Sequence, residues 1–483
     1  MAREVPGRHL ASLVVVAVCL ATACRSSDRP GAGPTTSGAP SATPVPAPTS
    51  TVGTIASSLP AATTPSCPAI PPRRDPAPDR PRYVLHVDVR PGQALVEGRQ
   101  EVEFSPDRDT DRLVFRLWPN GARQRAIGAG LDVTGLQVDG REARPTLDDP
   151  TTLVARPGNG IRAGRRVRAT LRWTLRLPRA VRDRISDEGE SVRLGSFFPI
   201  VEWQPGVGWL DDPPTTQFAE ASTAPTADFD LTVTAPEGFG VLASGVEDRP
   251  GHWTATAMRD VAVAVGRFTV TSAVARAPEP VKVTVGVQRG VGEQPSTYLQ
   301  KAVTVLEDFG RRFGPYPWPT FTVSVTPTLR SGIEYPGHVM QGPGTSGRSL
   351  THEVGHQWFY ALVGNNQARD PWIDEGGASW AEARWEGALA RFRGRAVPPE
   401  GRGRLGAPMT YWDPRSSAYY PGVYVQGVQA MAALGDPELV DCALRVFVAQ
   451  NAHRIATPAD FVAAMRAVFP AATTALAPFG IGG

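Results

Sequence analysis

The chain has 483 residues, of which 41% are hydrophobic and 20% are charged. This apolar content is enough for packed cores and excludes a chain that is disordered throughout. The formal net charge is +3, from 50 Lys and Arg against 47 Asp and Glu, so the concentrated basic field of a dedicated nucleic-acid binder is not expected. No apolar run reaches the roughly eighteen residues of a membrane-spanning helix.

The N-terminus has the pattern of an export signal. Arg3 and Arg8 precede an apolar run from Leu10 to Ala23, which ends in small residues, and this order is typical of a secretory signal. Leu20-Ala21-Thr22-Ala23-Cys24 also resembles a bacterial lipoprotein signal, although its leucine stands one place early. We expect residues 1–24 to be a signal peptide, with a lipid on Cys24 as the membrane anchor. An ordinary signal peptide and a secreted protein are the alternative.

A linker follows the signal. From Gly31 to Ser66 there is no charged residue, and Pro, Thr, Ser, Ala and Gly dominate. Such a composition cannot bury enough apolar surface to fold, so residues 25–80 are predicted to be a disordered tether. Cys67 and Cys442 lie outside the signal, and two interpretations stay open: they form a disulfide in an oxidising compartment, or Cys442 is a small core residue.

Residues 81–275 are predicted to form an all-β domain, a saddle or sandwich of antiparallel sheets. The clearest evidence is the stretch from Val167 to Leu177, where every second residue is apolar. Strict alternation indicates strands with one buried and one solvated face. Shorter stretches alternate in the same way, at 85–89, 113–117 and 229–233.

Residues 276–483 mix both periods and are predicted to form an α+β domain rich in helices. Strands are expected at 281–287 and 321–325, and an amphipathic helix capped by Ser296 at 299–313. Helical patterns prevail from Leu350 onward. A late helix should begin at Thr457, where a hydroxyl precedes a proline.

The segment His352-Glu353-Val354-Gly355-His356 carries the strongest chemical signal. Histidines four residues apart lie on one face of a helix, so their imidazoles can converge on a single zinc ion. Glu353 lies beside them, where it can accept a proton from a water that the metal activates. We expect a helix that runs to Gly364.

A catalytic zinc needs a third protein ligand, and Glu375 is the candidate. It follows His356 by eighteen intervening residues, on a helix expected to start after Asp370-Pro371. An antiparallel helix would return its carboxylate to the metal; alternatively, Glu375 only favours the helix N-terminus electrostatically. Asp374 is either a residue that orients a ligand imidazole or a solvated acid.

Together, the segments His352–Phe359 and Trp372–Gly376 resemble the zinc aminopeptidases of the aminopeptidase N family. The resemblance implies a gluzincin, with a thermolysin-like catalytic domain (276–483) behind an all-β saddle-shaped domain. It also implies one zinc ion, held by His352, His356 and Glu375.

Two further segments are similar to motifs of that family. Gly332-Ile333-Glu334-Tyr335-Pro336-Gly337 resembles G-x-M-E-N, with Ile in place of Met and Tyr in place of Asn. The resemblance implies that Gly332 and Glu334 bind substrate, with the Glu334 carboxylate receiving the free amine. The alternative is that Glu334 is a structural ion-pair partner, and nearby His338 could line the same pocket.

The second segment, Tyr419 to Gly427, resembles Y-x-K-G, with Gln426 in place of Lys. The resemblance implies that Tyr424 donates a hydrogen bond to the oxyanion of the reaction. Tyr419 and Tyr420 are rivals for this role, and a purely packing role for the aromatic ring is the alternative.

These features predict an exported zinc metallopeptidase with peptide substrates, which most resembles an aminopeptidase that releases N-terminal residues. Only 59 residues follow Tyr424, too few for the large helical domain that encloses the site in many family members. An open cleft and endopeptidase activity are therefore the first alternative. A non-catalytic surface-binding lipoprotein is the second, and the sequence leaves the oligomeric state open.

Overall fold

A computed structural model describes residues 64–217 and 223–482. The predicted signal peptide, Cys24 and most of the predicted tether lie outside these residues and stay predictions. Within the described ranges, no helix is both long enough and apolar enough to span a membrane.

The N-terminal part is rich in β-structure, as predicted. Its main sheet has eight strands, in the order β16 (Val246–Arg249), β17 (His252–Met258), β14 (Ala227–Thr234), β1 (Arg82–Val89), β2 (Leu95–Phe104), β8 (Val167–Arg176), β4 (Gly130–Val138) and β5 (Arg141–Glu142). Buried and exposed residues alternate along β8, which confirms the predicted strand. All neighbouring strands pair antiparallel except β1 and β14, which run parallel.

Smaller sheets complete this part. One contains β15 (Gly240–Ala243), β18 (Val263–Gly266), β10 (Ser191–Leu194) and β9 (Ser186–Asp187); another contains β11 (Ile200–Val201), β3 (Leu113–Arg116), β7 (Thr152–Ala155) and β6 (Thr146–Asp149). The strands β12 (Trp203–Gln204) and β13 (Gly208–Trp209) form a pair, and α1 spans Ala122–Ala126. All four residues of β3 are buried, so this strand has no solvated face.

A second, five-stranded sheet has the order β19 (Phe268–Arg276), β20 (Pro280–Gln288), β21 (Thr320–Val325), β23 (His338–Gln341) and β22 (Gly332–Ile333). The sequence pattern predicts a domain boundary between residues 275 and 276. In the structure β19 already belongs to the second sheet, because it pairs along its whole length with β20. The helix α2 (Pro295–Phe313) packs on β19 and β20. It begins one residue before Ser296, and the residue at its N-cap is Gln294.

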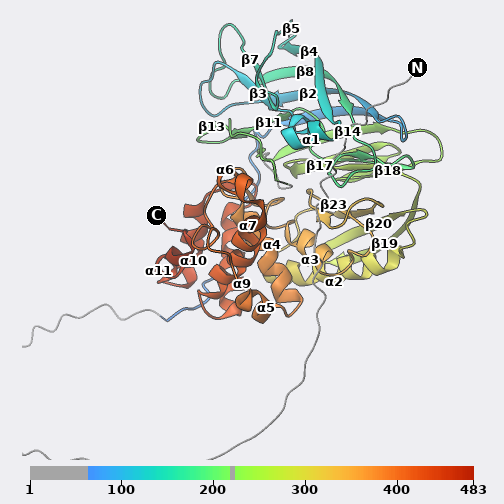
Figure 1. The fold of residues 1–483 in the computed structure, drawn as a ribbon. Coiled ribbons are helices and arrows are strands. Elements are labelled where there is room, and N and C mark those ends of the chain that lie inside the picture. The colour runs from blue at the N-terminus through green and yellow to red at the C-terminus, as the bar shows by residue number, and fades with distance from the viewer. Residues whose placement is uncertain (1–63, 218–222, 483) are drawn as a thin grey trace, which may run out of the picture. The chain divides into compact units, whose positions relative to one another are not determined.

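The C-terminal part is helical. Its helices are α3 (Arg348–Gly355), α4 (Trp372–Trp385), α5 (Leu389–Gly394), α6 (Met409–Trp412), α7 (Ser416–Tyr420), α8 (Gln426–Ala432), α9 (Pro437–Asn451), α10 (Pro458–Val468) and α11 (Ala472–Leu476), with a short strand pair, β24 (Gly364–Asn365) and β25 (Ile455–Ala456). Figure 1 shows α3 beside the second sheet. The helices from α4 onward, coloured orange to red, form a separate group. Thr457 caps α10 through a reciprocal bond pair with Asp460, which confirms the predicted helix start.

The two cysteines outside the signal form a disulfide. Cys67 pairs with Cys442 of α9, across a sequence separation of 375 residues. The chain after Cys67 then lies along the helical part: the Arg74 amide donates to the Ala449 carbonyl at 3.0 Å, and Arg73 donates to the Pro315 carbonyl at 2.8 Å. The segment 64–80, which was predicted to be part of the tether, is thus attached to the folded part of the chain by the disulfide and these hydrogen bonds.

Candidate metal centre and active site

The helix α3 carries both histidines of the predicted metal motif. It ends at Gly355, with His356 still in helical conformation, instead of continuing to Gly364. The next turns are wider than an α-helix, because the amides of residues 361, 362 and 363 donate to carbonyls five residues earlier. The turn from His352 to His356 itself is regular, because the His356 amide donates to the His352 carbonyl, and it brings the two rings together with Nε2 atoms 3.1 Å apart.

Glu375 on α4 completes a triangle with the two imidazoles. Its Oε2 atom lies 3.1 Å from His352 Nε2 and 3.4 Å from His356 Nε2. A tetrahedral zinc with bonds of about 2.0–2.1 Å needs ligand atoms roughly 3.3–3.4 Å apart. The three side chains therefore fit a zinc ion in both chemistry and spacing.

Close helix packing makes this approach of α4 to α3 possible. An ideal Cβ on Gly355 would lie 3.1 Å from the Ala378 backbone of α4, and one on Gly377 would lie 2.5 Å from the Phe359 ring. Gly355 of the metal motif and Gly377, which directly follows the Trp372–Gly376 segment, thus let α4 lie close to α3 and Phe359, so that Glu375 can reach both imidazoles.

The outer nitrogens of the two rings are also held. His356 Nδ1 lies 3.0 Å from the Phe359 carbonyl, to which it donates, so Nε2 carries the lone pair for a metal. His352 Nδ1 faces the Glu382 carboxylate at 3.6 Å, and Arg348 Nε donates to the same carboxylate at 2.6 Å. Glu382 is not among the site residues predicted from the sequence. Its position seven residues after Glu375, two helical turns on, is the signal that could have found it.

The donor set is electrostatically suited to hold positive charge. Burial lowers the pKa of His352, but its hydrogen bonds with Glu375 and Glu382 outweigh this and raise the pKa to about 10. Burial likewise lowers the pKa of His356, and the carboxylates around it raise that pKa well above its ordinary value. A divalent cation at the centre of the triangle would receive the same stabilisation from these carboxylates.

Asp374 holds the backbone at the start of α4. Its Oδ1 accepts the Glu375 amide and the Asn365 side chain, each at 3.0 Å, and its Oδ2 accepts Gln367 Nε2 at 3.0 Å. Asp374 is buried, so it is not the solvated acid that the sequence left as an alternative. These bonds orient the Glu375 ligand through its backbone.

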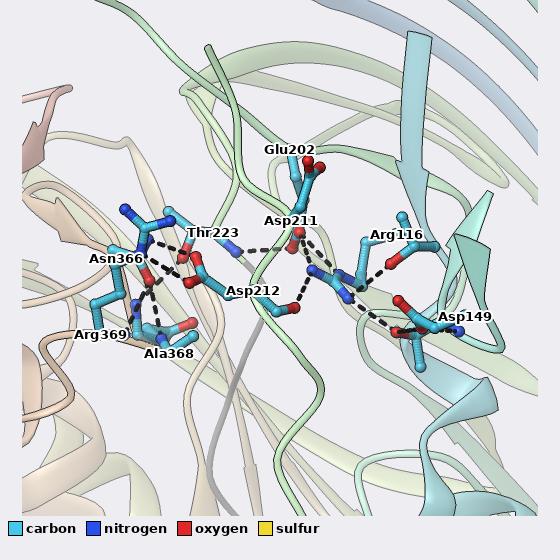
Figure 2. A network of polar contacts seen from close by, with 12 residues as sticks. Arg116, Asp149, Glu202, Asp211, Asp212, Thr223, Asn366, Ala368 and Arg369 are labelled. Carbon is cyan, nitrogen blue, oxygen red and sulfur yellow. Dashed lines mark hydrogen bonds and ion pairs between the residues drawn. The ribbon is translucent and has the colours of Figure 1, made fainter. Parts of the chain in front are cut away.

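The same bonds continue into the β-rich part. The Gln367 amide donates to Thr223 Oγ1 at 3.2 Å, and the Thr223 amide donates to Glu202 Oε1 at 3.0 Å. Glu202 in turn accepts Arg116 Nε of β3 at 2.8 Å. Figure 2 shows Thr223, Glu202 and Arg116 of this series of hydrogen bonds, with Asp212 beside them. Hydrogen bonds therefore connect α4, the helix that carries Glu375, to β3, a strand more than 250 positions earlier in the chain.

Glu353 and Gly332 are in direct contact. Glu353 is buried, and an ideal Cβ on Gly332 would lie only 2.2 Å from Glu353 Cγ. Any larger residue at 332 would therefore displace the Glu353 side chain. Carboxylate oxygens of Glu353 and Glu334 and a nitrogen of His356 lie within 4.8 Å of one another. This places the candidate base and the candidate amine receptor beside the metal triangle.

Tyr424 is the tyrosine whose hydroxyl reaches the metal site. It lies on a π-helix (Pro421–Val425) and donates to Glu375 Oε1. Its ring stacks on His352 with centroids 5.6 Å apart. Tyr420 lines the same cavity and is 37% exposed, whereas Tyr419 is buried against Trp412. Widened turns of this kind are frequent at functional sites.

One cavity of about 380 Å³ connects these groups. Its lining includes every residue that the sequence analysis assigns to the site; the full set is Arg184, Ser331, Gly332, Ile333, Glu334, Arg348, Ser349, His352, Glu353, His356, Glu375, Glu382, Tyr420 and Tyr424. His338 is not in this set. It is buried in β23, where its nitrogens contact the Ala262 carbonyl and Ser324 Oγ, and burial lowers its pKa to about 4.

No protein-family model matches the sequence. Solved structures of M1 zinc metallopeptidases have the same fold. The enzyme from Deinococcus radiodurans is 20% identical with a TM-score of 0.61, and the match covers 84% of this chain and 94% of that one. A Glu-to-Ala variant from the same organism, bound to a Tyr-Ser-Ala substrate, is 21% identical with a TM-score of 0.61 and the same coverage, 84% and 94%. A two-domain variant bound to L-arginine is 19% identical with a TM-score of 0.62, again covering 84% and 94%.

Proposed function

We propose that the protein is an exported zinc-dependent aminopeptidase. The observation that carries this proposal is the triangle of His352, His356 and Glu375 with Glu353, Tyr424 and Glu334 on the same cavity. The shared fold with M1 zinc metallopeptidases, one of them bound to a tripeptide substrate, supports it.

A zinc ion held by His352, His356 and Glu375 would lower the pKa of a water molecule and polarise the scissile carbonyl. Glu353 accepts the proton of the attacking water and passes it to the departing amine. Its position one residue after His352, pressed against the Gly332 backbone, holds its carboxylate at the site. A buried general base of this kind needs such fixed placement, since proton transfer requires hydrogen-bond distance.

Tyr424 stabilises the negative charge that develops on the carbonyl oxygen. Its hydroxyl already points at the metal triangle, through the hydrogen bond to Glu375 Oε1. During the reaction the hydroxyl turns from this carboxylate to the oxyanion. A hydrogen-bond donor to the oxyanion is worth about 2.7–4 kcal/mol of the barrier.

Glu334 sets the register of the substrate. Its carboxylate lies close to Glu353 and His356, so an ammonium group bound there would lie beside the scissile bond. Only the first residue of a peptide carries such a group at that distance from its carbonyl. The charge-assisted hydrogen bond would thus favour removal of single N-terminal residues.

The proposal includes a cellular location outside the cytoplasm. The signal-like residues 1–24 and the charge-free segment after them are those of an exported protein, with Cys24 as the site of a lipid anchor. The Cys67–Cys442 disulfide supports an oxidising compartment. Mass spectrometry of the mature N-terminus should find a lipid-modified Cys24; an unmodified N-terminus at another residue would contradict the anchor.

Turnover of leucyl-coumarin amide and of its N-acetylated form tests the activity. The purified protein should hydrolyse the free-amine substrate, lose this activity with 1,10-phenanthroline and regain it with zinc. The acetylated substrate should be cleaved far more slowly, because it has no ammonium for Glu334. Equal cleavage of both forms would overturn the aminopeptidase assignment in favour of an endopeptidase, and activity that resists the chelator would overturn the zinc chemistry.

A further inference from the structure

The strand β19 forms one edge of the second sheet, and β22, which lines the active-site cavity, forms the other edge. Figure 1 shows β19 on the side of the sheet away from β23. In the part of the chain that the structure describes, β19 pairs with β20 alone, in an unbroken register over nine residues. A long regular strand with a free edge can pair with a further strand, and proteins usually shorten or cover such edges.

The hydrogen bonds of the β19–β20 ladder show which backbone groups of β19 point outward. The Arg289 amide donates to the Arg267 carbonyl at 2.8 Å, and at the other end the Ala277 amide donates to the Glu279 carbonyl at 3.0 Å. Hydrogen-bonded pairs recur at every second residue of an antiparallel ladder. The odd-numbered residues of β19 therefore bond β20, and the N–H and C=O groups of the even-numbered residues point away from it.

Three even-numbered residues in the middle of the strand carry free backbone groups: Val270, Ser272 and Val274. Farther along, the outward amide of Arg276 is already bound, because it donates to Glu307 Oε1 of α2 at 2.9 Å. Within residues 64–217 and 223–482, the outward N–H and C=O groups of the three residues have no hydrogen-bond partner. The middle of β19 therefore presents a row of donors and acceptors to a further strand.

The side chains of the same three residues are exposed as well. Val270 and Val274 are 54% and 59% exposed, and Ser272 between them is also exposed. The other face of the strand is covered by α2. No charged residue stands between Phe268 and Ala275, although charged side chains commonly protect free edges from pairing. The edge is thus apolar and carries no charge that would prevent the addition of a strand.

This edge is complementary to itself. Its outward pattern, Val270-x-Ser272-x-Val274, reads the same from either end. A two-fold axis at Ser272 would pair this serine with its own copy, and Val270 with Val274 of the second copy. Every free donor then meets a free acceptor, and the exposed valines cover one another. Such a self-complementary patch is what a symmetric contact between two identical chains requires.

We propose that the β19 edge is an interface between two copies of this chain, which pair antiparallel about Ser272 and join their second sheets into one. A strand of unrelated sequence could use the same hydrogen bonds, but it would not need an edge whose exposed side chains repeat about its middle. The inference does not depend on the proposed aminopeptidase function. The β22 edge stays free, so the dimer leaves both active-site cavities accessible.

The size of the contact sets the strength of the dimer. A nine-residue strand is about 30 Å long. The helix α2 packs on β19 and β20, so it lies next to the new ladder in both copies and enlarges the contact. The total is at the lower end of the area of specific interfaces, roughly 1,000 Å². We therefore expect a reversible dimer and not a permanent one.

Sedimentation of the purified protein measures this dimer, with an expected Kd on the order of 10 µM. In Ser272→Lys, two lysines face each other across the axis, and like charges directly opposite each other destabilise a strand pair. Kd should rise at least about tenfold. Leu147→Lys is the matched control, because it adds the same charge at a 57% exposed residue of β6, and it should leave Kd unchanged. Thermal unfolding shows that both variants are folded.

Cysteine crosslinking tests the register. Residues in a hydrogen-bonded antiparallel pair have Cα atoms about 5.5 Å apart, a distance that a disulfide can span. Treated with diamide, Ser272→Cys should give a disulfide-linked dimer. The wild type, which has the same native cysteines, and Leu147→Cys should not.

Three results would overturn the inference. The first is a wild type that stays monomeric at about tenfold above the expected Kd, which is also the result expected if the edge accepts a different partner. The second is a dimer that Leu147→Lys weakens as much as Ser272→Lys does. The third is a Ser272→Cys protein that does not crosslink; this result decides the matter if Ser272→Lys does not fold.

Discussion

The active-site cavity has two walls of different construction. One wall comes from α3, α4 and the π-helix, where the His352, His356 and Glu375 side chains lie within 3.1–3.4 Å of one another. The other comes from the β-rich part and contributes Arg184, held by Trp118 and Tyr335. The first wall contains the groups to which we assign the reaction, and the second contains a buried arginine that aromatic side chains hold in place. Variants in the first wall should therefore affect the reaction most strongly.

The first wall is nevertheless connected to the β-rich part of the molecule. A series of hydrogen bonds connects the Glu375 backbone through Asp374 and Gln367 to Thr223 and Glu202. The β-rich part thus contributes to the metal site through the backbone of a ligand, and contributes Arg184 to the cavity lining directly. This distinction can be tested one residue at a time.

The largest effect is expected at Glu353. Glu353→Gln should keep its zinc but lose about 10²–10⁴ in kcat, because the amide has the shape of the carboxylate and cannot accept the proton. Metal analysis and turnover of leucyl-coumarin amide measure both properties. A variant that retains most of its turnover would remove Glu353 from the role of base.

Tyr424→Phe should come next, with a loss of about 10²–10³ in kcat and a small change in KM. The lost hydroxyl is a donor to the transition state, whereas the ring that stacks on His352 stays. Tyr420→Phe is the matched control, since Tyr420 lines the same cavity with its side chain partly exposed. A larger loss in the Tyr420 variant would mean that the oxyanion donor is assigned to the wrong tyrosine.

Removal of Asp374 should weaken metal binding without touching the cavity. Asp374→Ala deletes the acceptor that orients the start of α4, and zinc affinity should fall about 10–100-fold. Competition with a zinc-binding dye measures this affinity, and activity should recover at saturating zinc. Glu237→Ala, at an exposed acid, should leave the affinity unchanged. Unaltered affinity in the Asp374 variant would show that the link to the β-rich part does not position the ligand.

The disulfide lies outside both walls and should affect stability alone. Loss of the pair in Cys67→Ser/Cys442→Ser should reduce the free energy of unfolding by about 2–4 kcal/mol, because it frees the end of the segment that lies along α9. Thermal unfolding and kcat/KM at a temperature where both proteins are folded give the comparison. A changed substrate preference would show that the disulfide also affects the structure of the cavity.

The reaction wall could be predicted from the sequence because its groups follow from short spacings. Histidines four residues apart must share a helix face, and the geometry brings Glu375 to them as the spacing suggested. The widened turn after Gly355 could not be predicted, because it depends on tertiary packing around Phe359 and Trp358. Arg184 could not be predicted either, since it reaches the cavity only through the packing of the β-rich part on residues about 150 positions later.

The central claim is that His352, His356 and Glu375 together hold one zinc ion, and metal content measures this most directly. After zinc loading and dialysis, inductively coupled plasma mass spectrometry should find about one zinc per chain in the wild type. It should find almost none in folded His356→Ala and Glu375→Ala proteins. A wild type without bound zinc, or variants that retain a full equivalent, would contradict the account.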